Sequence, residues 1–477
     1  FFSRFCSKRD REREAGAHAM RGGWAAALVV TCTVAAWPAV VAATGVAVPL
    51  RFRAGPPSAR WAADHPQFFT QQRAGTASVP LGGGIPSIGM YYTRVLLGGQ
   101  EVHVQVDTGS STLAAPLKVC KHCRRDDRRY NLEMSEKGEV VACESSMCNG
   151  GCGYGCSSCS SSNGCCSASY KGGCHFKLSY ADGSGASGAL VRDELDWGGI
   201  KVNVTFGGIA EETKDFERPR VDGILGIGHS QQGCHPVCFP SAFAKMVSEG
   251  LVDDIFTICI SLEGGQMLLG GIDESAMAEK ITYVPAVESS AYWTARLTNK
   301  VTVGDDTFQF SKFPTQAVVD SGTTLLGLPR TAFDELRQYY QKHYCKIPGL
   351  CNGAGTWFKP GSCSAMKTEH VQALPTLKFY LQGGMTLVLP PDVYMIPYKD
   401  NGRDYMCLGL MITSMANEIV VGNTVMRRYV TVYDRVKSRI GFALSKPDCG
   451  AQTRDKSSDT DYSLATNVPA AELHNDR

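Results

Sequence analysis

The sequence predicts a mainly β protein made of two homologous lobes. Three features predict it: short apolar strands with glycine-rich turns run from about residue 88 to about residue 445, helical patterns are few, and a ten-residue motif occurs twice. A chain dominated by short strands and turns is typical of all-β folds. Two copies this far apart indicate two related lobes, because the repeats of a solenoid are much shorter.

The β pattern begins with two strands around a Gly-Gly turn. The segment MYYTRVLLGGQEVHVQVDTGSS covers residues 90–111, and Val102, Val104 and Val106 alternate with polar residues along its second half. Alternation with period two predicts strands with one buried face. Helical periodicity is confined to residues 240–250 and 331–343.

The repeat defines the two lobes. VQVDTGSSTL at residues 104–113 returns as AVVDSGTTLL at residues 317–326. Each copy is followed by two apolar residues and a glycine, first at residues 224–226 and then at residues 420–422. We therefore expect an N-terminal lobe over residues 79–262 and a C-terminal lobe over residues 263–449.

Asp107 and Asp320 are predicted to form a catalytic pair. Each aspartate ends an apolar strand, and the glycine two positions later lets the backbone turn. A pseudo-twofold axis between the lobes would bring the two carboxylates together, where they share one proton. One carboxylate could then deprotonate a water molecule while its protonated partner polarises a carbonyl group. A single copy would indicate only an ordinary Asp-Gly turn.

The residues beside each aspartate are predicted to support the pair. One hydroxyl in each copy can bond across the axis to the backbone of the opposite lobe, and a second can donate to the carboxylate from outside. Donation to the charged form favours ionisation. The crossing hydroxyls are those of Thr108 and Ser321, the outer ones are those of Ser110 and Thr323, and the glycines are Gly109 and Gly322.

With these motifs the sequence resembles the pepsin-like aspartic peptidases from about Tyr91 to Cys449. The resemblance implies a bilobal pepsin-like β fold with pseudo-twofold related lobes, a cleft for extended polypeptide, aspartic endopeptidase activity, and neither metal nor organic cofactor. A shared proton is a known property of this family's aspartate pair. The matching segments are DTGSS (107–111), SYADGSGASG (179–188), VDGILGIG (221–228), VVDSGTTLLGLP (318–329) and VVGNTVMRRYVTVYDRVKSRIGFA (420–443).

The resemblance also implies a mobile hairpin, the flap, that closes over the substrate. Tyr180 would be its tyrosine, and residues 181–184, including Asp182 and Gly183, would form its tip; the alternative for Tyr180 is a packed strand aromatic. The family's tryptophan after the first motif is replaced by Ala114, so flap closure must be supported differently. Asp182 predicts tolerance of Lys or Arg before the scissile bond.

Twenty cysteines favour an oxidising compartment. Ten lie in residues 117–174, a segment that resembles the cysteine-rich insertion of the nepenthesin-like plant enzymes and still more that of plasmepsin V. We expect disulfides here, with the pairing left open. Zinc is the alternative, since Cys120-x-x-Cys123 and Cys156-x-x-Cys159 have a metal-ligand spacing.

Four disulfides outside the insertion are also predicted. Two join cysteines that are close in the sequence, Cys234–Cys238 and Cys345–Cys351. The other two, Cys363–Cys407 and Cys259–Cys449, resemble bridges of the memapsin (beta-secretase) branch.

The N-terminal part predicts entry into the secretory pathway. Residues 20–43 have a charged start, an apolar stretch and small residues suited to a signal peptidase. An uncleaved signal anchor is the alternative. We expect residues 1–19 to be an upstream segment, residues 44–78 a propeptide or linker, and residues 450–477 a disordered tail without a membrane anchor. Asn203-Val204-Thr205 is a glycosylation sequon, which predicts a glycoprotein.

Composition excludes one class of partner and leaves other functions to be weighed. The formal net charge is +2, so nothing predicts nucleic-acid binding. We expect a monomer that acts on polypeptide substrates. An inactive relative that binds polypeptide is the first alternative, but such proteins usually lack an aspartate or the flap tyrosine. A cysteine-rich metal-binding or adhesion module, the second alternative, explains only residues 120–174.

Overall fold

The computed structural model divides the chain into two units, residues 1–70 and 71–477. In the first unit, β1 (Ala39–Ala43) pairs antiparallel with β2 (Val46–Leu50). β1 lies in the range predicted as a signal peptide, and β2 in the range predicted as a propeptide or linker. The structure describes residues 39–43, 46–50, 75–85, 89–124, 127–149, 165–180, 183–213, 221–229, 239–347, 350–351, 358–360, 362–400, 402–447 and 449.

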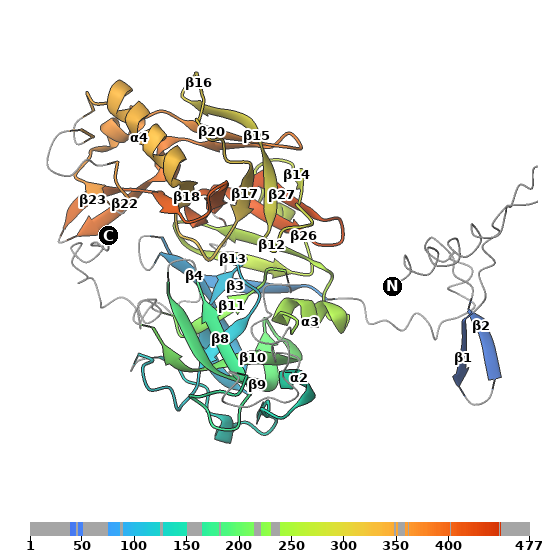
Figure 1. The fold of residues 1–477 in the computed structure, drawn as a ribbon. Coiled ribbons are helices and arrows are strands. Elements are labelled where there is room, and N and C mark those ends of the chain that lie inside the picture. The colour runs from blue at the N-terminus through green and yellow to red at the C-terminus, as the bar shows by residue number, and fades with distance from the viewer. Residues whose placement is uncertain are drawn as a thin grey trace, which may run out of the picture. The chain divides into compact units, whose positions relative to one another are not determined.

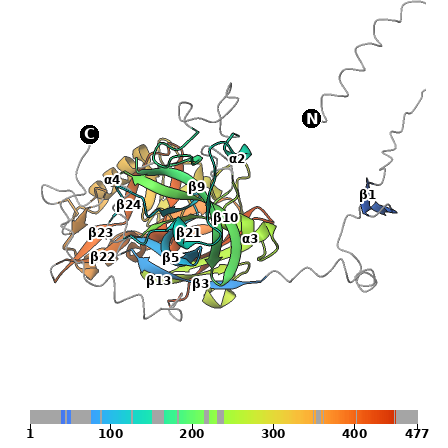
Figure 2. The same cartoon turned by 90° about the horizontal axis from the view of Figure 1, so that it is seen from below.

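The second unit is mainly β and bilobal, as the sequence predicts. Its largest sheet has 14 strands, and its β9–β10 hairpin has two arms of 13 residues each that run side by side (Figure 2). In spatial order the strands are β14 (Thr282–Pro285), β27 (Arg439–Leu444), β26 (Tyr429–Asp434), β12 (Ile255–Ile260), β13 (Glu263–Leu269), β3 (Ala77–Gly84), β4 (Met90–Leu97), β5 (Gln100–Asp107), β11 (Gly223–Gly226), β6 (Leu113–Pro116), β10 (Ile200–Glu212), β9 (Gly185–Trp197) and β7 (Glu139–Val140), with β8 (His175–Ser179) on β9.

This sheet joins strands from both ends of the unit. β26 and β27, which come last in the chain, pair through β12 and β13 with β3, which comes first. In Figure 1, β12, β13 and β26 lie between N-terminal strands such as β9 and C-terminal strands such as β20. The predicted boundary at residue 262 falls in the turn between β12 and β13, inside this shared sheet.

The C-terminal lobe contributes a second sheet of eight strands and a third of three. The eight strands are β21 (Thr386–Leu389), β20 (Leu377–Leu381), β15 (Thr294–Val303), β17 (Gln316–Val319), β25 (Glu418–Val421), β18 (Leu326–Pro329) and β24 (Leu410–Thr413), with β16 (Asp306–Phe308) on β15. The three are β19 (Cys363–Ser364), β23 (Arg403–Leu408) and β22 (Met395–Asp400).

The sequence repeat is also a repeat of topology. In the N-terminal lobe, β5 runs parallel to β11, which is antiparallel to β6, which is parallel to β10. In the C-terminal lobe, β17, β25, β18 and β24 follow the same scheme. The register repeats too, since Val106 pairs with Leu225 as Val319 pairs with Val421. The two aspartates therefore lie at equivalent positions at the ends of β5 and β17.

The Gly-Gly turn lies where the sequence predicts it. β4 and β5 are antiparallel, and Leu97 pairs with Gln100 across a two-residue turn. Gly98 and Gly99 have φ angles of 52° and 77°. Two successive positive φ angles match the twist of the flanking strands, and glycine adopts them without steric cost.

Both predicted helices are confirmed. The side chain of Ser241 caps α3 (Ala242–Ser248) by accepting from the Ala244 N–H at 3.2 Å. α4 (Arg330–His343) buries one face, which includes Phe333, Leu336 and Tyr340. Among the described helices, none has the length and apolar character that a membrane span requires. The shorter helical elements are η2 (Leu132–Met134), α2 (Ser146–Asn149), η4 (Glu274–Ala276), α5 (Thr368–Gln372), α6 (Pro391–Tyr394) and α7 (Asn423–Met426).

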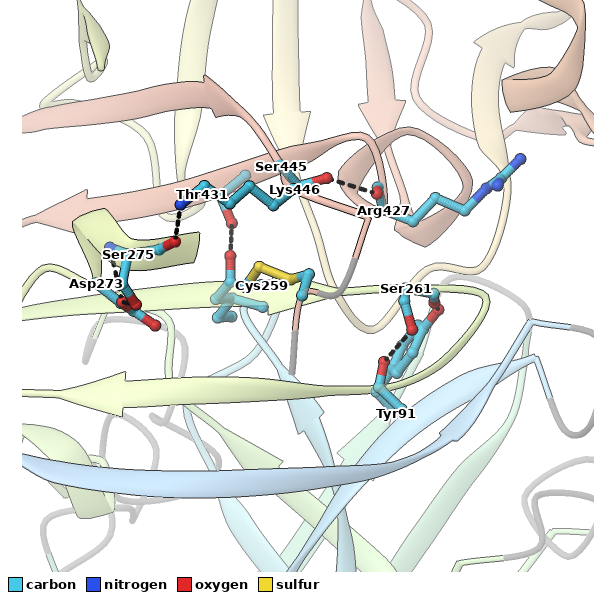
Figure 3. Close-up of a disulfide and its surroundings, with 12 residues drawn as sticks. Tyr91, Cys259, Ser261, Asp273, Ser275, Arg427, Thr431, Ser445 and Lys446 are labelled. Atoms are coloured by element: carbon cyan, nitrogen blue, oxygen red, sulfur yellow. Dashed lines mark hydrogen bonds between the residues drawn. A yellow bond between two sulfur atoms is a disulfide. The ribbon is translucent and has the colours of Figure 1, made fainter. Parts of the chain in front are cut away.

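Three disulfides in the second unit have the partners expected from the sequence. Cys345 pairs with Cys351, and Cys363 with Cys407, which is its register partner across β19 and β23. Cys259 on β12 pairs with Cys449, and this bridge ties the segment after β27 to the shared sheet (Figure 3). Nearby, the Lys446 ammonium donates to the Ser275 carbonyl at 2.7 Å. The predicted Cys234–Cys238 pair lies outside the described residues.

Disulfides also hold the cysteine-rich insertion. The structure pairs Cys143 with Cys166 and Cys148 with Cys174, and it closes Cys120–Cys123 over a separation of three residues. Cys123 lies near the carboxylates of Asp127 and Glu212. Because its sulfur is in a disulfide, Cys123 offers no thiolate for the zinc alternative. Cys156 and Cys159 lie outside the described residues.

Removing the Cys259–Cys449 disulfide is expected to destabilise the fold more than removing Cys345–Cys351. A cross-link over a longer loop removes more entropy from the unfolded chain, and separations of 190 and 6 residues correspond to losses of about 5 and about 2 kcal/mol. The double Cys→Ser variant of each pair can be compared by urea unfolding. Equal losses would contradict this expectation.

Candidate active site

The two aspartate loops meet at the ends of related strands. Asp107 is the last residue of β5 and pairs in register with Gly226 of β11. Asp320 directly follows β17, and its N–H donates to the Val421 carbonyl of β25 at 3.1 Å. Apolar strands thus deliver both carboxylates to the interior. Asp107 is buried and Asp320 is half-buried.

Thr108 and Ser321 lock the two loops together. The Thr108 N–H donates to the Ser321 hydroxyl at 3.0 Å, and the Ser321 N–H donates to the Thr108 hydroxyl at 2.9 Å. Each hydroxyl also donates to the opposite strand, that of Thr108 to the Val319 carbonyl at 3.0 Å and that of Ser321 to the Val106 carbonyl at 2.8 Å. Both side chains are buried, so these four bonds fix the loops relative to each other.

Each carboxylate has the same two donors within its own loop. The Gly109 N–H donates to Asp107 at 2.8 Å, and the Ser110 hydroxyl donates to its other oxygen at 2.5 Å. In the second loop, Gly322 and Thr323 donate to Asp320 at the same two distances. These donors fix the orientation of both carboxylates.

The two glycines are required because each lies against the opposite carboxylate. A Cβ atom at Gly109 would lie 2.5 Å from Oδ1 of Asp320, and one at Gly322 would overlap Oδ1 of Asp107. No side chain fits at either position without moving the carboxylates apart. The close approach of the two aspartates therefore depends on glycine in both triplets.

Electrostatics favour a proton on the pair. Burial raises the pKa of the Asp107 carboxyl above its ordinary value, and the negative charge of Asp320 raises this pKa further. The hydrogen bonds from Ser110 and Gly109 act in the opposite direction. Like charges in contact cannot both be ionised at low cost, so the pair retains a proton at pH values where an isolated carboxyl has lost it.

Residues behind the loops hold them by backbone N–H groups in both lobes, and in the C-terminal lobe the Asn423 N–H donates to the Thr323 carbonyl at 2.8 Å. The N–H groups of Ile227 and Gly228 donate to the carbonyls of Asp107 and Ser110, at 2.8 and 2.6 Å. In the C-terminal lobe, the buried Asn423 donates from its side chain to the Ser321 carbonyl at 2.9 Å. Asn423 is not among the site residues predicted from the sequence. Its position directly after the second apolar-apolar-glycine element was the available signal.

The predicted flap is a hairpin between β8 and β9. Ser179 pairs with Gly185, and the Tyr180 N–H donates to the Ser184 carbonyl at 2.9 Å. The Gly183 N–H donates back to the Tyr180 carbonyl at 3.1 Å, with a φ of 86° at Gly183. Tyr180 is half-buried against a cluster that includes Ala114, the residue at the family's tryptophan position. Asp182 lies outside the described residues.

Two aspartates in contact, each at the end of a repeated strand motif, define an aspartic-type peptidase. Comparison with known proteins agrees: the family described as Eukaryotic aspartyl protease matches residues 90–445. The chain belongs to this family, and it is a pepsin-like aspartic endopeptidase that hydrolyses peptide bonds in polypeptides.

Named relatives are similar over most of their length. Pepsin A of Rhinolophus ferrumequinum is 31% identical over 356 residues, covering 72% of this chain and 78% of that protein. Aspartic protease of Phaffia rhodozyma is 27% identical over 375 residues, 78% and 80% of the two chains. Aspartic proteinase 39 of Arabidopsis thaliana is 24% identical over 395 residues, 76% of each.

Thr108→Val is expected to lower both stability and kcat. Valine has nearly the same shape but lacks the hydroxyl that bonds Val319 and Ser321, so the variant should lose about 1–3 kcal/mol of unfolding free energy. Thr108→Ser keeps the hydroxyl and is the matched control. Urea unfolding and peptide cleavage measure the two effects, and equal behaviour of the two variants would contradict the role of the hydroxyl.

Asp107→Asn is expected to stabilise the fold at neutral pH by about 1 kcal/mol or more. Because the folded-state pKa of Asp107 is raised, the folded protein binds more protons than the unfolded chain over the pH range between the two pKa values. Wild-type stability therefore falls as pH rises through that range, whereas asparagine does not titrate.

Urea unfolding at about pH 4 and about pH 7 measures this difference, which should be larger at the higher pH. Asp404→Asn, at an exposed carboxylate of β23, is the control. A difference between Asp107→Asn and wild type that did not change with pH would contradict the expectation.

Proposed function

We propose that Asp107 and Asp320 are the catalytic pair and that they hydrolyse peptide bonds by activating a water molecule held between them. The observation that carries this proposal is the mutual contact of the two loops, in which each carboxylate lies against the glycine of the other triplet. Two carboxylates in contact with one proton can act as base and acid in the same step.

The mechanism follows from that shared proton. The ionised carboxylate takes a proton from the water as the oxygen of the water attacks the carbonyl carbon. In the same step the protonated partner donates its proton to the carbonyl oxygen. The tetrahedral intermediate collapses when the first carboxyl gives the proton that it took from the water to the amide nitrogen and the C–N bond breaks. The new carboxylic acid's hydroxyl returns a proton to the second carboxylate, which restores the shared proton. Ser110 and Thr323 keep the carboxylates oriented through this cycle, because their hydroxyls donate to the outer oxygens.

Substrate binding is assigned to the β8–β9 hairpin. Tyr180 and Gly183 shape its turn through the hydrogen bond from the Gly183 N–H to the Tyr180 carbonyl, and Asp182 lies between them in the sequence. In this proposal Tyr180 closes over an extended polypeptide, and Asp182 favours Lys or Arg before the scissile bond.

The cysteine-rich insertion supports placement in the nepenthesin and plasmepsin V-like branch of the family. Support comes from its ten cysteines and from the disulfides that cross-link it internally, Cys143–Cys166 and Cys148–Cys174. Disulfides persist in oxidising compartments, and Asn203 of the sequon is exposed on β10. We therefore assign the enzyme to the secretory pathway, acting as a monomer.

Asp320→Ala is expected to lower kcat by at least about a thousandfold, because it removes one member of the acid–base pair. The measurement is cleavage of an unstructured peptide library by residues 76–450 with disulfides intact, at about pH 4 and about pH 7, with and without pepstatin. Asp404→Ala is the control for loss of a surface carboxylate. Cleavage by folded Asp320→Ala at the wild-type rate would refute the assignment.

A further inference from the structure

An aromatic cluster lies behind the catalytic loops. We define it by five rings: His229, Phe243, Phe256, Trp293 and Tyr433. They come from the segment after β11, from α3, from β12, from the turn before β15 and from β26. Four of these side chains are fully buried, and His229 is half-buried at the edge.

Trp293 is the centre of the cluster. Its ring lies 5.1 Å from that of Tyr433 and 6.0 Å from that of Phe256, both edge to face. The imidazole of His229 packs on it with a centroid distance of 4.5 Å and an interplanar angle of 37°. Aromatic pairs at such distances stabilise a fold by more than the burial of their apolar area alone.

The contact between His229 and Trp293 bridges the supports of the two loops. His229 follows Ile227 and Gly228, whose N–H groups hold the carbonyls of Asp107 and Ser110. On the other side, the Trp293 carbonyl accepts from the Val319 N–H at 2.8 Å, and the Val319 carbonyl accepts from the Thr108 hydroxyl. A displacement of His229 relative to Trp293 therefore acts on both aspartate loops through these hydrogen bonds.

We propose that His229 is a positioning residue for peptide hydrolysis: its neutral ring, packed against Trp293, holds the Asp107 loop in its active geometry, and acidification loosens that hold. The proposal rests on the assignment of the catalytic pair made above. It gives the enzyme a limit on its activity at low pH that is separate from the titration of the aspartates.

The surroundings of His229 disfavour its charged form. Burial lowers the pKa of His229, and the positive charge of Arg435 lowers it further. Arg435 lies in the turn after β26 and pairs with Asp254 at 3.2 Å, so that carboxylate is already engaged. Burial raises the pKa of the Tyr433 phenol, which stays neutral. Among the described residues, Arg435 is thus the charge that acts on the imidazole.

The sign of the pH effect follows from the lowered pKa. The unfolded chain binds a proton at His229 at higher pH than the folded protein does. The stabilisation that the contact between His229 and Trp293 provides is complete above the ordinary histidine pKa of about 6.5 and is lost as pH falls towards the folded-state value. Below that value a second cation sits beside Arg435.

The test compares two kinds of substitution at His229. His229→Phe keeps a ring on Trp293 but cannot titrate, so the ratio of kcat at about pH 4.5 to kcat at about pH 7 should rise about threefold or more over wild type. His229→Ala removes the ring, and kcat at neutral pH should fall about tenfold with little change in KM. The fall should be smaller at the acidic pH, where the wild-type contact is already loosened. His229→Tyr is a second ring that does not titrate in this range.

The control is His343→Phe. His343 also packs on an aromatic ring, that of Tyr339 at 4.4 Å, but it lies at the end of α4. His343→Phe should leave the ratio of kcat at the acidic pH to kcat at the neutral pH at its wild-type value. The proposal would be overturned if His229→Phe and His229→Tyr both kept the wild-type ratio of kcat at the acidic pH to kcat at the neutral pH. It would also be overturned if His229→Ala kept the wild-type kcat at neutral pH.

A second readout does not depend on activity. A protonated imidazole quenches a neighbouring indole, so wild-type tryptophan fluorescence should show a transition on acidification that His229→Phe lacks. Identical titrations of the two proteins would also overturn the proposal. An inactive wild type would count against the assignment of the catalytic pair. It would not count against the contact between His229 and Trp293, which the fluorescence titration tests independently.

Discussion

The structure depends on holding two carboxylates in contact, one buried and one half-buried. This contact opposes folding, because burial and like charge both disfavour ionised aspartates. Four hydrogen bonds between the Thr108 and Ser321 loops offset that cost, since a buried and fully satisfied network is rigid. The contact also requires glycine at the third position of each triplet, because the opposite carboxylate occupies the space that a side chain would take. The contacts that set the catalytic geometry therefore also hold the two lobes together.

The shared sheet explains how that interface resists separation. β27 pairs with β26, and β26 pairs with β12, which connects through β13 to β3 of the N-terminal lobe. The Cys259–Cys449 disulfide fastens the end of the described chain to the same strands. The aromatic cluster fills the space behind the loops, where Phe256 and Tyr433 stack at 4.6 Å. Covalent, backbone and packing interactions thus converge behind one site.

The two halves share a topology but not all of their supports. Backbone N–H groups of Ile227 and Gly228 hold the first loop and that of Asn423 holds the second, where the Asn423 side chain donates as well. The surroundings differ as well, because the N-terminal lobe carries the disulfide-linked insertion and the hairpin of Tyr180. A symmetric pair in an asymmetric setting suits a reaction in which one carboxylate acts as base and the other as acid.

The sequence by itself determined the fold class, both helices and the residues that meet at the site. Strand alternation, helical periodicity and a repeated motif are local signals, readable without knowledge of contacts. Only the tertiary structure decided that β26 and β27 join the N-terminal sheet, how Cys143, Cys148 and their partners pair, and that His229 packs against Trp293. Such contacts join positions far apart in the chain, and no local period encodes which distant partner a strand, a thiol or a ring will meet.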